Sequence, residues 1–266
     1  MKRIELFEFE DYDWLPKTIR TSCTHLIVVL HKMLGTPAVL IDLLRNVRQH
    51  YPFTQITDLG SGSGGAMPLV MEQWQHKTES VQLLLTDLHP HPEFVSYINK
   101  KGLDYLRYHP DAVDATQFDQ VPGGLKTMVN SFHHMSPPMA RKILASAQDN
   151  RQPLLIYEMG ENFVPTWLWW LLLPLSLCIL IVMALIMTLF VKPLGWKQVV
   201  FTYLIPIIPL VYAWDGQAST MRTYTFDDLK SILPPAEAGY TWTMEKAKKR
   251  NGKNLGYYVL GLPLSS

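Results

Sequence analysis

A glycine-rich segment, residues 58–64, has the residue types and the spacing of a loop that holds a small molecule. It reads DLGSGSG, so an acid stands ahead of three glycines at every second position. Glycine permits tight turns and lets backbone N–H groups approach a ligand closely. Similar loops hold dinucleotides or phosphates or only reverse the chain, so the loop alone does not identify its ligand. Its candidate ligand-contacting residues are Asp58, Gly60, Ser61, Gly62 and Gly64.

A second acid favours a nucleoside as the ligand. Asp87, followed by Leu88, comes directly after the apolar stretch at residues 81–86. Doubly wound folds place an acid at about this separation from the glycine loop, where it binds a ribose hydroxyl. The carboxylates of Asp58 and Asp87 can then lie on either side of one nucleoside.

The elements that must position these residues alternate between strand and helix. Ahead of the loop, residues 18–48 have helical apolar spacing and are divided into two helices by the sequence GTP at residues 35–37. The predicted strands are residues 55–59, 81–86, 106–108, 126–130, 154–158, 240–246 and 255–262, and helices are predicted at residues 66–76 and 138–148. The last two strands form an antiparallel hairpin at the edge of the sheet. The predicted fold class is α/β, with a doubly wound, mostly parallel sheet of seven strands.

These residues resemble the class I S-adenosylmethionine-dependent methyltransferases, a Rossmann-like family in which an acid-x-Gly-x-Gly-x-Gly loop holds the cofactor. The resemblance covers residues 51–158 and 222–266 and includes an antiparallel last strand. It implies that S-adenosyl-L-methionine is the cofactor and that Asp87 lies at its ribose. It also implies that Asp114 and Ala115 lie beside the adenine.

The segment NSFHH, residues 130–134, follows the predicted fourth strand, where the resemblance implies cofactor-binding and catalytic residues. The family often has an acid where Asn130 stands, so only a cofactor contact is expected of Asn130. A neutral imidazole of His133 or His134 can take a proton from a hydroxyl or amine acceptor. Glu158, at the end of the predicted fifth strand, is a further candidate base. The competing interpretations are that a histidine only fills a polar gap and that Glu158 is a salt-bridge partner.

A nicotinamide dehydrogenase is the competing interpretation of the glycine loop. Such enzymes have the spacing Gly-x-Gly-x-x-Gly, and an acid such as Asp58 would lie poorly beside a pyrophosphate. Adenosylmethionine has no phosphate and carries an ammonium group, which a carboxylate attracts. The loop therefore favours the methyltransferase. No metal is expected, because His89 and His91 have no nearby cysteine or paired carboxylate.

The composition changes abruptly after the predicted fifth strand. Residues 163–191 form an apolar run without a charged side chain, and this run is long enough to span a bilayer. Residues 199–213 form a second apolar run, which is interrupted by two prolines. The turn between the runs carries Lys192 and Lys197, which the positive-inside tendency keeps cytosolic. We therefore expect an apolar helical hairpin that dips into one leaflet. The competing interpretation is a soluble protein whose insert is a buried helical cap or a dimer interface.

Five further residues are candidates for the substrate mouth. Asp215, Arg222 and Tyr224 follow the second apolar run, where the chain must return to the sheet, and Arg222 is suited to a phosphate or carboxylate. Tyr12 and Trp14 could form a lid over the site. The competing interpretations are interfacial anchoring for Arg222 and a hydrophobic staple for the two aromatic residues.

These observations predict three parts of the chain and one activity. Residues 1–50 are a helical cap, residues 51–162 and 214–266 form the catalytic domain, and residues 163–213 are the membrane hairpin. The predicted protein is a membrane-associated methyltransferase, facing the cytosol, that methylates an oxygen or nitrogen of a lipid-like or other apolar small molecule. The alternative is a non-catalytic, cofactor-binding membrane scaffold. A formal net charge of +1 disfavours nucleic acid as a partner, two isolated cysteines fit a reducing compartment, and the oligomeric state is not predicted.

Overall fold

The chain forms two compact units in the computed structural model, which describes residues 1–75 and 80–264. The sheet unit comprises Gly35–Gly160 and Phe226–Ser266, and the helical unit comprises Met1–Leu34 and Glu161–Thr225. Each unit has an apolar core of its own.

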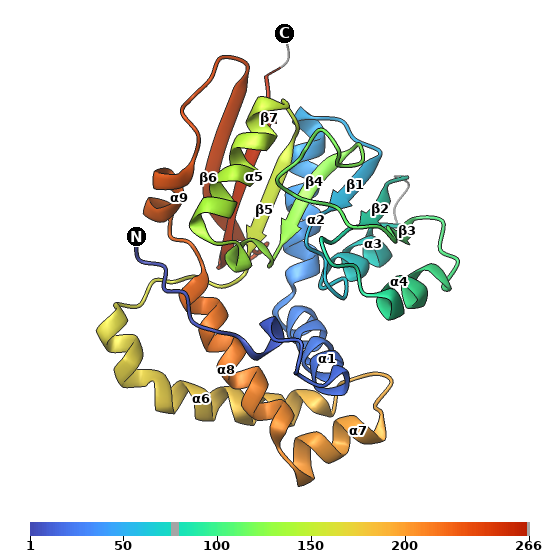
Figure 1. The fold of residues 1–266 in the computed structure, drawn as a ribbon, viewed down its shortest axis with the longest axis vertical. Coiled ribbons are helices and arrows are strands. Elements are labelled where there is room, and N and C mark those ends of the chain that lie inside the picture. Colours follow the sequence, from blue (N-terminus) through green and yellow to red (C-terminus); the bar gives the residue numbers. More distant parts are fainter. Residues whose placement is uncertain (76–79, 265–266) are drawn as a thin grey trace. The chain divides into compact units, whose positions relative to one another are not determined.

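A seven-stranded sheet in the order β3-β2-β1-β4-β5-β7-β6 forms the centre of the sheet unit (Figure 1). The first five strands pair in parallel, β7 is antiparallel to β5, and β6 is antiparallel to β7. The strands are β1 Gln55–Asp58, β2 Gln82–Leu85, β3 Leu106–Tyr108, β4 Leu125–Val129, β5 Leu154–Glu158, β6 Tyr240–Lys248 and β7 Asn254–Pro263. This order confirms the predicted doubly wound fold and its closing hairpin.

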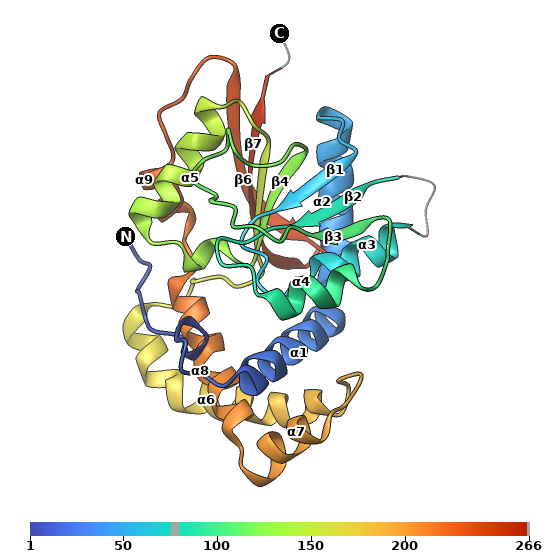
Figure 2. The same cartoon turned by 45° about the vertical axis from the view of Figure 1, so that its right-hand side comes forward.

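Helices cover both faces of the sheet, which explains why its central strands are almost continuously apolar. Every residue of β5 is buried, as is all of β4 except its last residue. On one face, α2 (Thr36–His50), α3 (Met67–Gln75) and α4 (Pro92–Asn99) share a single core. On the other face, α5 (Pro137–Asp149) and α9 (Phe226–Ile232) contact each other (Figures 1 and 2).

Helix α4 was not predicted from the sequence. Residues 89–91 lie in a loop, and Pro92 takes the first position of the helix that follows. Proline is favoured there because the first N–H groups of a helix have no partner within the helix. The predicted helix at residues 66–76 corresponds to α3, and its predicted last residue, His76, lies outside the described residues.

Three long helices pack together in the helical unit. They are α1 (Lys17–Leu34), α6 (Thr166–Thr188) and α8 (Ile207–Arg222), and they share a core that includes Leu26, Ala184 and Val211. The shorter elements are η1 (Phe9–Asp11), α7 (Trp196–Val199) and η3 (Val200–Leu204), which is a π-helix. Helices α6 and α8 contact each other extensively, so the apolar insert does form a helical hairpin (Figure 1).

The helix that contains the second apolar run extends beyond the last residue of that run. Helix α8 continues past Ala213, through Trp214 and Asp215, to Arg222. The chain therefore remains in the helical unit up to Thr225 instead of returning to the sheet from Trp214. The reason is that polar residues of α8 form hydrogen bonds and ion pairs with other residues of the helical unit.

One helix, α6, is long and apolar enough to cross a membrane, with a mean hydropathy of 2.7 in its most apolar window. Two pairs of helices joined at a sharp bend pass the same test only when each pair is counted as one span. They are α1 with α2, and α7 and η3 with α8, and the second pair is bent by 79°. These statements concern length and composition in the described part of the chain.

Candidate active site

The glycine loop connects β1 to α3 at the carboxyl edge of the parallel strands. Asp58 is the last residue of β1, and Gly62 and Gly64 have φ angles of 50° and 99°, which favour glycine. A Cβ atom at Gly64 would also lie 3.1 Å from the Pro68 ring. The loop is held to the end of β2 by a 2.9 Å hydrogen bond from the Ser61 N–H to the Thr86 carbonyl oxygen. The loop is therefore a turn that hydrogen bonds hold in place, at the edge where open α/β sheets bind ligands.

The Asp58 carboxylate is buried beneath this loop and accepts two hydroxyl hydrogen bonds. Thr127 Oγ1 donates to it at 2.6 Å and Ser61 Oγ donates at 2.7 Å. Burial raises the pKa of Asp58 to about 7, because the loss of solvation outweighs the two hydrogen bonds that lower it. Asp58 thus titrates near neutral pH, where its charge responds to a nearby cation.

Asp87 lies at the rim of the loop and binds backbone N–H groups. Its carboxylate accepts the N–H of Gly62 at 2.8 Å and the N–H of His89 at 2.9 Å. Next to it, Leu88 is 44 % exposed. The Tyr108 hydroxyl donates to the Gly62 carbonyl oxygen at 2.7 Å and so fixes the same loop from β3. The structure therefore joins the loop and the predicted ribose acid directly.

The predicted adenine pair, Asp114 and Ala115, begins a turn that is tied to Asp87. The N–H of Val113 donates to the Asp87 carbonyl oxygen at 2.8 Å. The Asp114 carboxylate accepts the N–H of Thr116 at 2.8 Å, and this bond lowers the pKa of Asp114 below its usual value. Both predicted residues are half-buried.

Asn130 joins the ends of β4 and β5. It has a φ angle of 53°, in the left-handed region, its N–H donates to the Tyr157 carbonyl oxygen at 2.8 Å, and its Oδ1 accepts the N–H of Met159 at 2.7 Å. The next residue, Ser131, donates from Oγ to the Leu59 carbonyl oxygen at 3.2 Å. This segment is thereby linked to both the glycine loop and β5.

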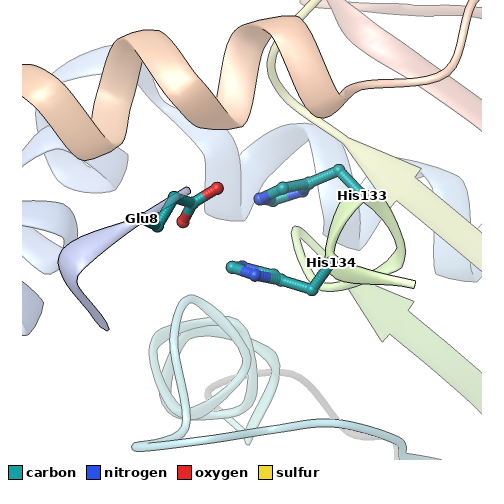
Figure 3. Close-up of side chains that lie close together, drawn as sticks. All are labelled: Glu8, His133 and His134. Carbon is teal, nitrogen blue, oxygen red and sulfur yellow. The ribbon is translucent and has the colours of Figure 1, made fainter. Parts of the chain in front are cut away.

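His133 and Glu158 form a buried pair. Glu158 Oε1 accepts the backbone N–H of His133 at 3.0 Å, and Glu158 Oε2 lies 2.8 Å from His133 Nδ1. The two residues are only 6 % and 1 % exposed. The ring of His134 lies beside that of His133, with centroids 4.3 Å apart, and both project from η2 (Phe132–His134) after β4 (Figure 3). The structure thus brings all three predicted catalytic candidates together.

The bonding of this pair assigns different roles to its two members. Both oxygens of Glu158 are engaged by His133, so the carboxylate orients the imidazole and stabilises its protonated form. With Nδ1–H donated to the carboxylate, Nε2 of a neutral His133 becomes the nitrogen that accepts a proton. The arrangement is that of a general base with an orienting acid.

The five predicted substrate residues all lie in the helical unit, and they have partners there. Asp215 accepts the N–H of Phe9 at 2.7 Å, and Tyr12 and Trp14 are exposed and stacked, with ring centroids 6.0 Å apart. Tyr224 is buried under the Arg3 guanidinium. Their part in binding a substrate stays a prediction.

Arg222, predicted to bind a phosphate or carboxylate of the substrate, pairs instead with two acids of the N-terminal segment. Its guanidinium lies 2.9 Å from a Glu8 oxygen and 2.8 Å from an Asp11 oxygen. Arg222 and Glu8 are both buried. The ion cluster is therefore internal to the helical unit.

Sequence reasoning missed the two residues that support the glycine loop from neighbouring strands. Thr127, in β4, bonds to Asp58, and Tyr108, in β3, bonds to Gly62. Both residues belong to predicted strands, and the strand order places Thr127 of β4 beside β1 and Tyr108 of β3 beside β2. Nothing in the sequence indicated which side chains faced the loop.

The sequence matches no protein-family model and no curated protein. Three solved structures that the chain is similar to are methyltransferases. The plantazolicin methyltransferase BpumL, in complex with SAH, is 9 % identical and has a TM-score of 0.48, over 94 % of this chain and 86 % of that one. The methyltransferase domain of bacterial CtHen1 is 10 % identical with a TM-score of 0.48, over 89 % of this chain and all of that one. The O-methyltransferase NcsB1, in complex with S-adenosylmethionine and a naphthoic acid, is 12 % identical with a TM-score of 0.43, over 79 % of this chain and 49 % of that one.

Proposed function

We propose that this protein is a membrane-associated S-adenosylmethionine-dependent methyltransferase that acts on an apolar small molecule with a hydroxyl or amine group. The observation that carries the proposal is the meeting, at one edge of the sheet, of a two-acid glycine loop and a buried His133–Glu158 pair. The link from Ser131 to Leu59 joins these two parts of the site.

The residues around the glycine loop fit the proposed cofactor. A buried carboxylate at Asp58 suits an ammonium group, because a nearby cation favours the charged form. Asp87, at the rim, suits a pair of ribose hydroxyls, which can donate where backbone N–H groups donate now. Asp114 and Ala115 would lie at the adenine. When bound, the cofactor supplies an electrophilic methyl group.

The contribution of the chain itself is orientation and removal of a proton. His133 Nε2 would accept the proton of the attacking hydroxyl or amine, while Glu158 holds the ring and stabilises the imidazolium. His134 stacks beside His133 and narrows the space around it. Proton transfer of this kind typically contributes about 100- to 10,000-fold to a rate.

An apolar acceptor is proposed from the position of the hydrophobic insert in the chain. Helix α6 begins eight residues after β5 ends with Glu158, and residues 163–191 carry no charge. A membrane-embedded insert that follows the base so closely in the chain would let a lipid-soluble acceptor reach the site without crossing water. The proposal places the catalytic domain on the cytosolic side, in agreement with the lysines of the hairpin turn.

The test combines binding and turnover in the detergent-solubilised full-length protein. Calorimetric titration with adenosylmethionine measures binding, and transfer of a labelled methyl group to a membrane lipid extract measures turnover. We expect His133→Gln and Glu158→Gln to lower kcat by about 100-fold or more while cofactor affinity stays within a few-fold. The matched control is His50→Gln, an exposed histidine at the end of α2.

Three outcomes of this test separate the alternatives. Binding with turnover that depends on His133 supports the proposal. Binding without turnover on any acceptor supports the scaffold instead. Absence of binding by the folded protein contradicts both.

A further inference from the structure

One face of α6 is apolar, exposed and continuous along the helix. The residues that define this apolar stripe are Leu171, Leu175, Ile179, Val182, Ile186 and Leu189, each 50–68 % exposed. They recur at intervals of three and four residues, which places them on a single face of a helix. At about 1.5 Å per residue, the apolar stripe is about 27 Å long.

The opposite face of α6 packs against α8, which runs antiparallel to it. Near one end, Ala184 shares a core with Val211 of α8. Near the other end, Leu173 shares a cluster with Met221. Trp169 Nε1 also donates to the Gln217 side chain at 3.0 Å. The half of α8 that follows Trp214 therefore packs beside the first half of α6.

That half of α8 carries charged groups. Asp215 accepts the N–H groups of Phe9 and Glu10, and Arg222 pairs with Glu8 and Asp11. An α6 that crossed the bilayer would carry these side chains into the hydrocarbon beside it, since helices pack about 10 Å apart. Charged side chains at that depth are unfavourable and are rare in membrane-spanning segments.

A lipid surface is the partner that fits the apolar stripe. Protein interfaces have a polar rim, whereas no charged side chain occurs in residues 163–191. The exposed apolar surface continues around the tip of the hairpin, through Leu194, Trp196 and Leu204. The flanking lysines of the tip, Lys192 and Lys197, are exposed and suit anionic headgroups.

We infer that the insert is monotopic. Helix α6 lies in the plane of the membrane with its apolar stripe among the acyl chains of one leaflet, and neither α6 nor α8 crosses the bilayer. The hairpin tip and the catalytic domain are then on the same side. This inference rests on the membrane attachment in the proposed function and specifies its geometry.

The test places one cysteine in each part of the full-length protein. Cys178→Ser removes the exposed native cysteine, and Cys23 is buried. Tyr97→Cys marks the sheet unit on α4, and Lys197→Cys marks the hairpin tip, and both positions are exposed. The protein with these three substitutions is reconstituted in sealed vesicles of phosphatidylcholine and phosphatidylglycerol. A membrane-impermeant maleimide is added before and after a pore-forming peptide, and the number of labels on each intact molecule is measured by mass spectrometry.

The monotopic arrangement predicts that each molecule is labelled at both cysteines or at neither before pores form. A crossing hairpin separates the two cysteines, so each molecule would be labelled at one of them and the pores would expose the other. That second pattern overturns the inference while leaving membrane attachment intact. If the protein does not sediment with the vesicles at all, the membrane attachment in the proposed function fails instead.

A matched pair of charge substitutions tests the apolar stripe itself. We expect Ile179→Glu to weaken sedimentation with the same vesicles by at least tenfold, because it places a carboxylate among acyl chains. Tyr97→Glu, at an exposed apolar position of the sheet unit, should leave sedimentation unchanged. Equal effects of the two changes, or none from Ile179→Glu, would contradict insertion of the apolar stripe.

Discussion

The two units of this protein differ in the side chains that they leave exposed, although each has an apolar core. In the sheet unit, apolar strands are covered on both faces, and the buried carboxylates of Asp58 and Glu158 lie at the edge where a ligand can bind. In the helical unit, Arg222 and Glu8 are buried as an ion pair, while leucines such as Leu171 are 68 % exposed.

The difference indicates what each unit is built to contact. The carboxylate of Asp87 bonds to backbone N–H groups at an exposed rim, and a ligand's hydroxyl groups can share it. In the helical unit, Arg222 pairs with Glu8 and Asp11, and Asp215 accepts the N–H of Phe9, so these bonds fix the N-terminal segment to α8. The sheet unit thus presents a polar rim, and the helical unit presents an exposed apolar face on α6.

The largest effect is expected from breaking the buried ion pair. Arg222→Ala removes the cation that pairs with the buried Glu8 carboxylate, which should lower the free energy of unfolding by about 3–5 kcal/mol. Lys230→Ala is the control, because Lys230 pairs with Asp227 at the surface, where such a pair contributes at most about 1 kcal/mol. Urea unfolding of the detergent-solubilised protein measures both. Similar losses in the two variants would show that the helical unit is not organised around its buried charges.

The rim of the glycine loop provides the next largest effect. Asp87→Ala should weaken adenosylmethionine binding by about 100-fold, since each hydrogen bond to a charged group contributes about 1.5–3 kcal/mol. Asp104→Ala, an exposed acid before β3, should leave the dissociation constant unchanged. Calorimetric titration gives both values. An unchanged affinity in Asp87→Ala would remove the ribose role of this carboxylate.

Local patterns were sufficient to predict the strands of the sheet unit. Strand-length apolar stretches and a glycine loop specified β1 to β5, and turn spacing specified the closing hairpin. The helix α4 was missed because two prolines obscured its start. Its position depends on the apolar packing of Ile98 against the core, which no local pattern reports.

Pairings between distant residues could not be predicted from the sequence. Glu8 and Arg222 are 214 positions apart, and neither has a local pattern that indicates its partner. His133 and Glu158 were expected at the ends of neighbouring strands, because parallel strands end at one edge. That their side chains bond depends on the left-handed turn at Asn130, which sets the direction of the segment that follows β4.

A smaller effect concerns the pH dependence of cofactor binding. Burial raises the pKa of Asp58 to about 7, so the ionised fraction rises about fivefold between pH 6 and pH 7. Affinity for the ammonium-bearing cofactor should rise by about the same factor, and Asp58→Asn should abolish this rise. The raised pKa also means that the cofactor-free fold binds this proton more tightly than the unfolded chain does, so stability falls as pH rises from about 4 towards 7. A pH-independent affinity in the unaltered protein would contradict a cation beside Asp58.

The smallest effect is expected from Leu175→Ala, which compares the exposed face of α6 with its packed face. Leu175 is 60 % exposed on the apolar stripe, and Leu173 is 9 % exposed on the face that packs against α8. In detergent, Leu175→Ala should change the free energy of unfolding by at most about 0.5 kcal/mol, because surface substitutions rarely do more. Leu173→Ala should lower it by about 2–3 kcal/mol through the cavity that it leaves. Equal losses would mean that both faces of α6 are packed against protein, and the helical unit would then bury its apolar side chains as the sheet unit does.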